Sequence, residues 1–587
     1  MNDIKIEWKN RLENALFALA NLNDLKIKRE EIDLNIGIPP TKELGDIAFP
    51  LFSLAKLFRK NPVQIAGDLK NYFEVNDQQA SSGIILSGPY INIKIDLSSQ
   101  SAKVIDGILE TKELYGHTKD YNNQKVMVEF SCPNTNKPLH LGHLRNDSIG
   151  MSVARIMEAN GAEVRKVNLI NDRGVHICKS MLAYKTFGKS TSPESMGIKS
   201  DHFVGNYYVK FNNWSKENPE AEIEARSMLR EWEDGKEDVT ELWKKMNNWT
   251  ISGIKETYRK TGISFDKYYF ESKTYREGRE EILKGFNAGV FYKEDDGSIW
   301  ADLSEIKLDK KVLLRSDGTS LYLTQDIGTA IARHRDWEFK KLIYVVGSEQ
   351  QYHFQVLFYI LKKLGFKWAT DLHHLSYGMV NLPDGKMKSR EGTVVDADDL
   401  IDELTSIAKA EIVSKERISE VGDLQLTAES VALAALNYFL LQISPSKDMI
   451  FNPSESISFS GNTGPYLQYM GARISSMLRK YEERKDGFLG AVYSPDLLVT
   501  DQERELIKLL MIFPEIVSNA GKGMNPSIIT TYLYDLSKVF SRYYHDTSIL
   551  NEADKNIVVS RIQLVKAVLQ VLKNAFYLVG IPFLERM

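Results

Sequence analysis

The stretch VMVEFSCPNTNKPLHLGHLRND, from Val126 to Asp147, carries the clearest structural signal in the sequence. It opens with VMVEF, a run of β-branched and apolar residues typical of a strand buried in a parallel sheet. A loop containing Pro133 and Pro138 follows, and the next residues, HLRNDSIGMSVARIMEANG, have the pattern of a helix. A strand, a loop and a helix in this order predict the opening unit of a nucleotide-binding α/β fold.

The four residues His140-Leu141-Gly142-His143 lie where this strand gives way to the helix. Histidines three residues apart share one face of a first helical turn, and Gly142 leaves room for a nucleotide close to the backbone. The helix N-terminus adds amide donors and positive potential for phosphate. Paired imidazoles can donate hydrogen bonds to an α-phosphate as its charge grows, which stabilises a transition state without acid–base catalysis. Taken alone, the four residues are equally consistent with an ordinary helix start.

A second segment, GMVNLPDGKMKSREGTVV from Gly378 to Val395, contains a cluster of cations. Lys386 and Lys388 follow a Pro-Asp-Gly turn, a placement that lets positive charge close over a triphosphate and neutralise its leaving group. Taken alone, such a cluster is more typical of a solvated basic loop. Its order after the HLGH segment, with a predicted strand and helix between them, favours a phosphate-binding role.

Further alternation of strands and helices extends the first unit into a doubly wound sheet. The sequence predicts strands at Val164–Ile170 and Lys341–Val346, and a helix at Gln351–Leu364. Between them, residues from about 185 to 300 have helix-spaced apolar residues and many charges, which predicts a mainly helical insertion. The expected fold class is therefore α/β and multidomain, with a Rossmann-type catalytic domain at residues 111–405.

Two flanking domains are expected. Residues 1–110 combine an amphipathic opening helix, a helix around Leu51–Arg59 and a strand at Gly88–Ile95, which predicts a small α/β domain. Beyond about residue 405 strand signals fade, and residues 406–587 predict an all-helical bundle. Its expected helices lie at Val431–Gln442, Pro465–Arg479, Glu503–Leu510, Ile528–Tyr544 and Asn556–Val579.

Composition limits the class of protein. With 587 residues, 43% of them hydrophobic and 26% charged, the chain can bury several cores. The first residues lack the pattern of a secretory signal, and no apolar run approaches the ~18 residues needed to cross a bilayer. Cys132 and Cys178 are too few for a disulfide framework or a structural zinc site, so we expect a cytoplasmic protein without a metal centre of its own. A net charge of −4 leaves a nucleic-acid partner undecided.

Together these segments resemble the class I aminoacyl-tRNA synthetases. The HLGH residues are similar to the HIGH motif, and the lead-in SxPNxxKPLHLGHLR resembles the arginyl branch in particular. The run KMKSR resembles the KMSKS loop, with Ser389 in the position of the second lysine; arginyl enzymes commonly show this loss, and the resemblance implies that Lys137 compensates. It assigns ATP binding to His140, Gly142, His143, Lys386 and Lys388, and catalysis to Lys137, His140, His143 and Lys386.

The same resemblance implies an arginine site. The run RSDGTSLYLTQDIGTAIAR, Arg315 to Arg333, is similar to an arginyl-family sequence in which a tyrosine and an aspartate four residues later hold the guanidinium. Carboxylates suit the donor fork of arginine, and a spacing of four places both residues on one side of a helix start. The implied arginine-binding residues are Glu129, Asn134, Tyr322, Asp326 and Gln350. A turn containing Asn171, Asp172 and Gly174 is expected to shape the pocket.

The flanking domains resemble the tRNA-binding parts of arginyl enzymes. Ala435–Lys480 is similar to a DALR anticodon-binding domain, and Gly45–Pro62 to the additional N-terminal domain, where Arg59 and Lys60 are weaker candidates for phosphate contact. The implied RNA contacts are Tyr466, Tyr469 and the terminal Met587, because aromatic side chains stack on unpaired bases. Aromatic residues at helical spacing are also typical of a core.

The resemblance implies an arginine–tRNA ligase that uses ATP with Mg²⁺, L-arginine and tRNA(Arg), acts as a monomer and needs no membrane. Family members first form arginyl-adenylate, with tRNA already bound, and then transfer the arginyl group to tRNA. Two other classes stay open: a catalytically silent tRNA-binding paralogue, and a small-molecule nucleotidyltransferase, which shares the His-x-Gly-His turn but lacks a helical bundle of this size. Among synthetases, the glutamyl and cysteinyl enzymes are the nearest alternatives; an acidic pocket and the lack of a zinc-ligand cysteine cluster disfavour them.

Overall fold

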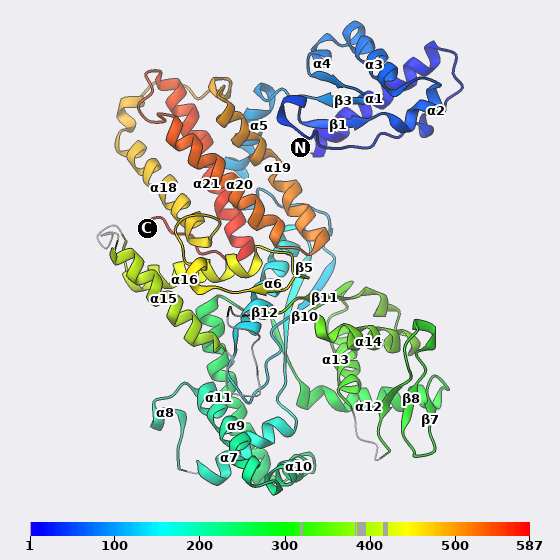
Figure 1. Cartoon of the computed structure of the whole chain (residues 1–587), viewed down its shortest axis with the longest axis vertical. Helices are drawn as coiled ribbons and strands as arrows, with labels where there is room; N and C mark the ends of the chain where they lie inside the picture. Colours follow the sequence, from blue (N-terminus) through cyan, green and yellow to red (C-terminus); the bar gives the residue numbers. More distant parts are fainter. Residues whose placement is uncertain (1, 189, 317–320, 382, 384–394, 415–420) are drawn as a thin grey trace. The chain divides into compact units, whose positions relative to one another are not determined.

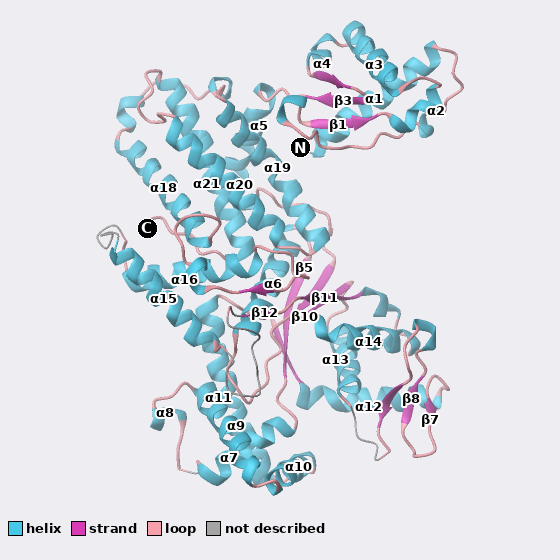
Figure 2. Ribbon diagram, in the orientation of Figure 1, coloured by secondary structure: helices cyan, strands magenta, loops and turns pink. Residues whose placement is uncertain are grey.

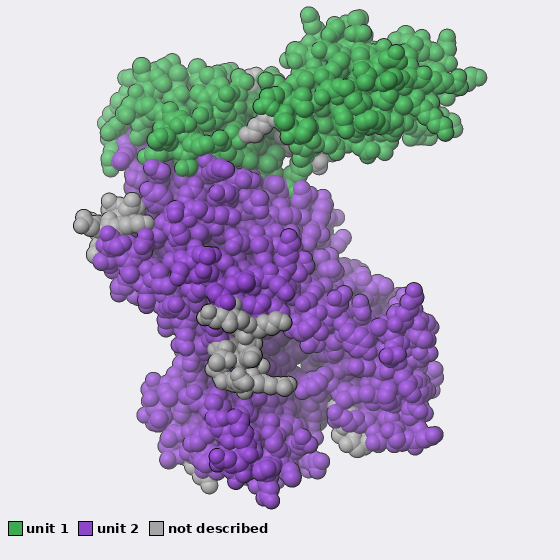
Figure 3. Space-filling model, viewed as in Figure 1, with its two compact units in different colours: residues 1–115, 483–515, 539–571 green, residues 116–482, 516–538, 572–587 purple. Residues whose placement is uncertain are grey.

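The computed structural model describes the chain apart from residues 1, 189, 317–320, 382, 384–394 and 415–420. Two compact units are present, and each is described by itself (Figure 3). One comprises residues 1–115, 483–515 and 539–571, and the other residues 116–482, 516–538 and 572–587. Three long C-terminal helices therefore contribute residues to both units: α19 (Asp501–Gly523), α20 (Ser527–Asp546) and α21 (Lys555–Val579).

A five-stranded parallel sheet forms the centre of the larger unit (Figure 2). Its spatial order is β6-β5-β4-β10-β11, so chain order runs outward from β4 first to one side and then to the other. This is the doubly wound arrangement, in which ligands bind beyond the carboxyl ends of the strands where the order reverses, here between β4 and β10. The strands are β4 (Lys125–Glu129), β5 (Glu163–Ile170), β6 (Lys267–Phe270), β10 (Lys341–Gly347) and β11 (Leu372–Tyr377).

Burial explains why these segments form the sheet. Val126, Met127 and Val128 of β4 are fully buried, as a strand covered on both faces requires. Two helices continue the alternation: α6 (Leu141–Ala159) after β4 and α14 (Gln351–Lys363) after β10. The strands and helix predicted at 164–170, 341–346 and 351–364 are thus confirmed to within one residue. The β6 and β11 strands were not predicted, and β6 lies inside the region expected to be a mainly helical insertion.

That region begins as a helical layer with its own core. Its helices are α7 (Val175–Phe187), α8 (Pro193–Met196), α9 (Ser200–Glu217), α10 (Glu220–Glu233) and α11 (Glu237–Thr261). Buried residues from four of them, including Tyr184, Phe211, Met228 and Met246, form one hydrophobic cluster. The apolar stripes read from the sequence therefore face one another, while one charged residue of these helices, Asp201, is also buried.

In the chain, a helix pair and a small antiparallel sheet follow β6 and precede β10. Helix α12 (Glu271–Asn287) packs on α13 (Tyr322–Asp336), and between them in the chain are β7 (Tyr292–Lys293), β8 (Ile299–Ala301) and β9 (Lys311–Leu314). The two helices approach closely at Gly278, where an added Cβ would lie 1.7 Å from the backbone oxygen of Thr324. Glycine at this crossing sets the position of the first turns of α13.

The smaller unit contains the N-terminal α/β fold. Helix α3 packs on a three-stranded antiparallel sheet of order β1-β3-β2, and helix α1 packs on α3. The elements are α1 (Asn2–Leu22), β1 (Ile47–Pro50), α2 (Ala55–Phe58), α3 (Pro62–Asn76), α4 (Gln78–Ser82), β2 (Ile84–Ser87), β3 (Tyr90–Ile93) and α5 (Ser98–Thr111). The predicted strand at 88–95 and helix at 51–59 correspond to β3 and to a 3₁₀ turn followed by α2.

Helices dominate the C-terminal part of the chain, as predicted (Figure 1). Besides α19, α20 and α21, they are α15 (Ala397–Ser414), α16 (Leu424–Leu441), α17 (Pro453–Ser456) and α18 (Gly464–Glu483), with one short strand pair of β12 (Val380–Asn381) and β13 (Met449–Ile450). Among the described residues, α16 and α21 are long and apolar enough to cross a membrane. Most of each apolar window is buried, and core helices pass the same test.

Candidate active site

The HLGH residues form the start of helix α6, and their side chains cap it. His140 is the N-cap residue, and its Nδ1 accepts a hydrogen bond from the Gly142 N–H at 3.1 Å. The Nδ1 of His143 accepts one from the His140 N–H at 3.2 Å, and the two ring centroids lie 3.9 Å apart. Since both Nδ1 atoms accept, the proton of each neutral ring belongs on Nε2. The predicted pairing of the imidazoles on one face is confirmed.

Burial keeps both imidazoles neutral. Burial, and then the charge of Lys137, lowers the pKa of His140 to about 4. The pKa of His143 is also lowered well below its usual value, by burial first and then by the charges of His140 and Lys137. Burial also lowers the pKa of Lys137. At neutral pH the two rings are therefore uncharged Nε2–H donors beside a lysine, which suits hydrogen bonding to phosphate oxygens.

Amide side chains hold the loop between β4 and HLGH. Ser131 and Cys132 have positive φ angles of 75° and 50°, a conformation that L-residues adopt at a cost. Their N–H groups donate to the side chains of Asn146 at 2.6 Å and Asn168 at 3.2 Å. Asn171, predicted to shape the pocket, donates to the Cys132 oxygen at 3.0 Å. These bonds fix the direction in which the chain leaves the sheet.

Asn134 and the turn after β5 lie beside this loop. Asn134 forms a parallel bridge with Asn171. Asp172 accepts hydrogen bonds from the N–H of Ser272 at 2.9 Å and from its hydroxyl at 2.7 Å, so it ties the turn to helix α12. Gly174 has a φ of 131° and precedes α7. The turn of residues 171–174 thus joins the loop that follows β4 to the start of helix α12.

Lys386 and Lys388 lie outside the described residues, but the segments on either side of them are held against α6. The Leu141 N–H donates to the Val395 oxygen and the Ala397 N–H donates to the Leu139 oxygen, each at 3.0 Å. On the other side, Arg145 of α6 donates to the Met379 oxygen at 2.9 Å. The two signature segments of the sequence are therefore joined by main-chain hydrogen bonds at the start of one helix.

Of the expected arginine-binding residues, Glu129 ends β4, Gln350 follows β10, and Asp326 contacts the helix that begins after β10. Tyr322 is the first residue of α13 and is exposed, and Asp326 follows one turn later. One oxygen of Asp326 lies 2.6 Å from Nε2 of His353 in the first turn of α14, and its side chain is still 33% exposed. Gln350 is exposed just after β10. Asp326 thus keeps an accessible carboxylate next to the sheet's switch point.

Glu129 has a partner that the sequence did not indicate. Its carboxylate forms a buried ion pair with Arg333, two turns along α13 from Asp326. The guanidinium of Arg333 also lies 5.2 Å from the Tyr269 ring centre and 5.7 Å from that of Tyr344. The negative charge expected from Glu129 is therefore compensated within the protein, and the pair anchors α13 to β4.

Glu271 is an acidic residue of this region that sequence reasoning missed. It is buried at the first position of α12, and burial, followed by the charge of Asp326, raises its pKa to about 8. In the amide orientation that satisfies both neighbours, Gln325 donates to Glu271 and accepts from Arg173 at 2.8 Å. A single glutamate in a charged stretch gives no sequence signal. Two acidic groups whose charges repel one another favour a cationic ligand.

The candidate tRNA-binding residues are partly buried. The Tyr466 ring lies 6.3 Å from that of Tyr534, and the Arg473 guanidinium lies 5.7 Å from the Tyr469 ring centre. Met587 is buried in a hydrophobic cluster with residues of α15 and α16. In the smaller unit, Arg59 ends α2 with a positive φ, and Lys60 forms an ion pair with Asp68 at 2.7 Å. Roles in RNA binding stay predictions for all of them.

Comparisons with known proteins decide between the classes left open. The model for tRNA synthetases class I (R), catalytic domain, matches residues 104–453, the DALR anticodon binding domain matches 467–587, and the arginyl tRNA synthetase N terminal domain matches 7–95. The chain belongs to the class I arginyl-tRNA synthetase family. Members of this family activate arginine with ATP and transfer it to tRNA, so the silent paralogue and the nucleotidyltransferase are not favoured.

Relatives and solved structures of arginyl-tRNA synthetases agree along the chain. Proteins named arginine–tRNA ligase from Treponema denticola and Treponema pallidum are 57% and 55% identical, each covering 100% of both chains. The solved Thermus thermophilus arginyl-tRNA synthetase has a TM-score of 0.80 at 24% identity and covers 99% of this chain and 100% of its own. The Plasmodium falciparum enzyme has a TM-score of 0.76 at 22% identity and covers 100% and 99%. At these identities the solved structures show the fold, which confirms the expected fold class.

Proposed function

We propose that this arginyl-tRNA synthetase forms arginyl-adenylate at the start of α6, with ATP on the HLGH residues and the guanidinium of arginine on Asp326. The observation that supports this most strongly is the main-chain pairing of Leu139–Leu141 with Val395–Ala397, because it joins the two phosphate-binding segments of the sequence. Asp326 lies at the switch point of the same sheet, where doubly wound folds bind ligands.

In the first step, a carboxylate oxygen of arginine forms a bond to the α-phosphorus of ATP, and the bond from that phosphorus to the bridging oxygen breaks, releasing pyrophosphate. The Nε2–H groups of His140 and His143 donate to the α-phosphate oxygens, whose charge grows in the transition state. Lys137 and Lys386 neutralise the departing pyrophosphate. Gly142 leaves space for the nucleotide, and Lys388 adds charge to the same site.

In the second step, a hydroxyl of the terminal ribose of tRNA attacks the carbonyl carbon of the adenylate and AMP leaves. Positioning carries most of this step, because the adenylate is already activated. We propose that Tyr466, Tyr469 and Met587 contact the anticodon and that residues 1–110 contact the tRNA body. The proposed domains are residues 1–110, 111–405 with the insertion at about 185–300, and 406–587.

Selection of arginine follows from the charges around Asp326. Its exposed oxygen and the Tyr322 hydroxyl offer acceptors to the guanidinium fork, and Glu271 gains negative charge when a bound guanidinium favours its ionised form. Asn134 and Gln350 are proposed to hold the amino and carboxyl end of arginine. Glu129 acts through Arg333, since its carboxylate is already paired.

Mg²⁺ is proposed to arrive bound to ATP. Among the described residues, the donors of Asp201, His202 and Asp398 lie within 4.8 Å of one another, but the Nζ of Lys199 lies 2.6 Å from Asp398 and 3.0 Å from Asp201. That cluster already holds a cation and does not fit a metal ion. Triphosphate oxygens and water are ligands that Mg²⁺ accepts without a protein cage. We also propose that the protein acts in the cytoplasm as a monomer and needs no membrane.

The arginine KM is expected to fall as pH rises from about 6 to about 8. Glu271, whose pKa is about 8 without ligand, is largely protonated at neutral pH, and a guanidinium beside it favours the ionised form. Binding of arginine therefore releases a proton. Below the pKa of Glu271, the KM for arginine falls by at most about tenfold for each pH unit. Arginine-dependent pyrophosphate exchange across this range measures it. We expect Glu271→Gln to abolish this pH dependence of the KM. If Glu271→Gln keeps it, another group than Glu271 causes the pH dependence.

The two lysines of the phosphate site are expected to act on one leaving group. Lys137→Ala and Lys386→Ala each lower kcat for pyrophosphate exchange by about tenfold, because each removes a charge-assisted hydrogen bond to pyrophosphate. The double variant loses less than the product of the single losses, since both residues serve the same group. Lys367→Ala, an exposed lysine in the larger unit, is the matched control. If the kcat loss of the double variant equals the product of the two single losses, the two lysines do not act on the same leaving group.

The function itself is tested by arginine-dependent pyrophosphate exchange and by aminoacylation across the amino acids, each with and without tRNA. We expect exchange only with arginine and only when tRNA is present, and charging of tRNA(Arg) alone. Binding of tRNA without exchange would indicate a silent paralogue. Exchange with an unrelated substrate and no charging would indicate a nucleotidyltransferase.

A further inference from the structure

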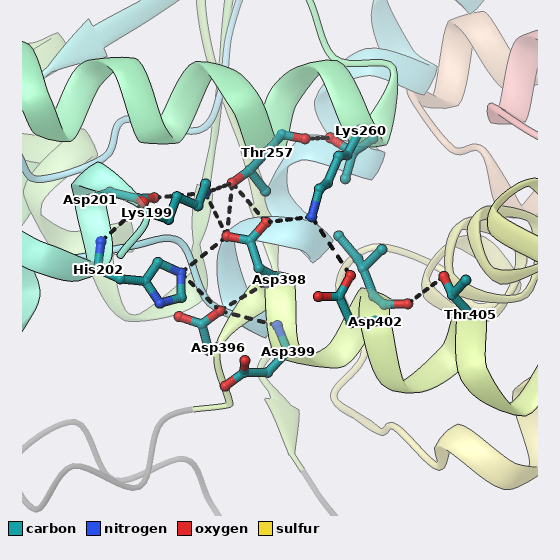
Figure 4. Close-up of polar contacts among 12 residues, drawn as sticks. Lys199, Asp201, His202, Thr257, Lys260, Asp396, Asp398, Asp399, Asp402 and Thr405 are labelled. Carbon is teal, nitrogen blue, oxygen red and sulfur yellow. Dashed lines mark hydrogen bonds and ion pairs between the residues drawn. The ribbon is translucent and has the colours of Figure 1, made fainter. Parts of the chain in front are cut away.

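The carboxylate of Asp398, in the first turn of α15, is surrounded by donors from two helices of the insertion (Figure 4). The Nζ of Lys199 lies 2.6 Å from it, the Thr257 hydroxyl donates to it at 3.2 Å, and Nε2 of His202 is also at 3.2 Å. Lys260 adds a contact at 3.7 Å. We call these four residues around Asp398 the Asp398 clasp. They tie α9 and α11 to the start of α15.

The clasp lies directly beside the main-chain pairing at the active site. Asp398 follows the segment Val395–Ala397, which pairs with Leu139–Leu141, and Asp396 forms an antiparallel bridge with His140. The Asp396 carboxylate also accepts a hydrogen bond from the Asp398 N–H at 2.9 Å. The position of Asp398 therefore determines where the strand partner of His140 lies.

The clasp is held by charge and by an additional hydrogen bond. Lys199 donates to the Thr257 hydroxyl at 2.7 Å, and this hydroxyl in turn donates to Asp398. The Asp398 side chain is 8% exposed, so its contacts with the two lysines are little screened by water. Of the four clasp residues, three place a donor within hydrogen-bond distance of the carboxylate, which restricts it more than a single surface ion pair does.

Helix α11, which supplies Thr257 and Lys260 to the clasp, also contacts the loop that leads into HLGH. The Thr250 hydroxyl donates to the Thr135 oxygen at 3.0 Å, and the Tyr258 hydroxyl lies 2.6 Å from the hydroxyl of Ser131. Thr250, Thr257 and Tyr258 are spaced by seven and eight residues on α11, and thus lie on one face two turns apart. One face of α11 therefore contacts both the loop that precedes Leu139–Leu141 and the Asp398 carboxylate that follows Val395–Ala397.

We propose that Asp398 is a positioning residue for adenylate formation: the clasp fixes Val395–Ala397 against Leu139–Leu141 and so holds His140 at the α-phosphate. The inference rests on the proposed role of His140. Removing the Asp398 charge frees the strand partner of His140 without touching any group that contacts substrate. A displacement of about 1 Å at reacting groups costs up to about 100-fold in rate, so the effect appears in kcat.

The test is Asp398→Asn compared with Asp399→Asn in the full-length enzyme. Asp399 is the adjacent residue of the same helix turn with an exposed carboxylate, so its variant removes the same charge at the helix N-terminus. We expect Asp398→Asn to lower kcat for arginine-dependent pyrophosphate exchange by about tenfold or more while the KM for arginine changes little. Asp399→Asn should behave as wild type. Amide exchange at Leu141 and Ala397 should be faster in Asp398→Asn alone.

A second pair of variants tests the clasp from its other side. Lys199→Met should reproduce the kcat loss, and Lys199→Arg, which keeps the charge, should restore most of the rate. These variants and Thr257→Val provide the same readout if Asp398→Asn does not fold. A structural role without positioning would lower the melting temperature and leave kcat unchanged.

Two results overturn the inference. One is an Asp398→Asn enzyme that folds and has wild-type kcat; the other is an equal loss in Asp399→Asn. His140→Asn separates this inference from the proposed function. Loss of activity in His140→Asn with a fully active Asp398→Asn contradicts only the clasp, whereas a fully active His140→Asn contradicts the proposed site itself.

Discussion

Replacing Asp326 by Asn lowers kcat/KM for arginine by about 10²- to 10³-fold, because a guanidinium bound in the pocket loses its charged acceptor. The carboxylate is accessible at the switch point of the sheet, whereas the carboxyl of Glu271 is buried and has a raised pKa, so ionising it at neutral pH costs free energy. Glu271 therefore replaces the charge of Asp326 only in part. The loss should appear mainly in the KM for arginine, with the KM for ATP unchanged.

Citrulline provides the sharpest measurement of this effect. It has nearly the shape of arginine but no charge, so the ratio of kcat/KM for the two substrates reports the charge of the pocket. We expect this ratio to collapse in Asp326→Asn. Glu338→Gln, which removes an exposed carboxylate just beyond the same helix, should leave the ratio unchanged. An unchanged ratio in Asp326→Asn would exclude Asp326 from arginine recognition.

His140→Asn is expected to lower kcat for pyrophosphate exchange by about 10²- to 10³-fold, as removal of a preorganised oxyanion donor does elsewhere. Asparagine is a favoured N-cap residue, so this substitution keeps the cap of α6 and removes the Nε2–H. Thermal stability should therefore change little. The same reasoning applies to His143→Asn, with some loss of the hydrogen bond to the His140 N–H.

The pH dependence distinguishes a hydrogen-bond donor from a general base. Because the pKa of His140 is about 4 and burial lowers that of His143 well below its usual value, neither ring changes charge between about pH 6 and pH 8. The kcat profile of the wild type should show no titration of His140 or His143 in this range. His117→Asn, at an exposed histidine of the larger unit, is the control. A titration near 6.5 that disappears in His140→Asn would establish acid–base chemistry instead.

The central sheet is predictable from the sequence where its strands are long and buried on both faces. The apolar runs at β4 and β10 have this character, and β5 is buried over its last four residues. By contrast, β6 is four residues long within a charged, mostly helical stretch, and β11 contains two histidines that interrupt its apolar pattern. Only the pairing of these strands with their neighbours, a tertiary interaction, makes them strands.

The candidate site is predictable to the extent that its residues lie in continuous motifs. The spacing of His140 and His143, and of Tyr322 and Asp326, follows from the geometry of a helix start. The partners of these residues come from distant parts of the chain, and local patterns do not contain them. The pairing of Glu129 with Arg333, the acidic neighbour Glu271 and the Asp398 clasp all belong to this second kind.

A crystal structure of the enzyme with tRNA and a non-hydrolysable arginyl-adenylate analogue is the most direct test of the proposed site. We predict the α-phosphate mimic within hydrogen-bond distance of Nε2 of His140 and His143, with the guanidinium on Asp326. An analogue bound with its guanidinium away from Asp326, or with both imidazoles facing away from the phosphate mimic, would contradict it.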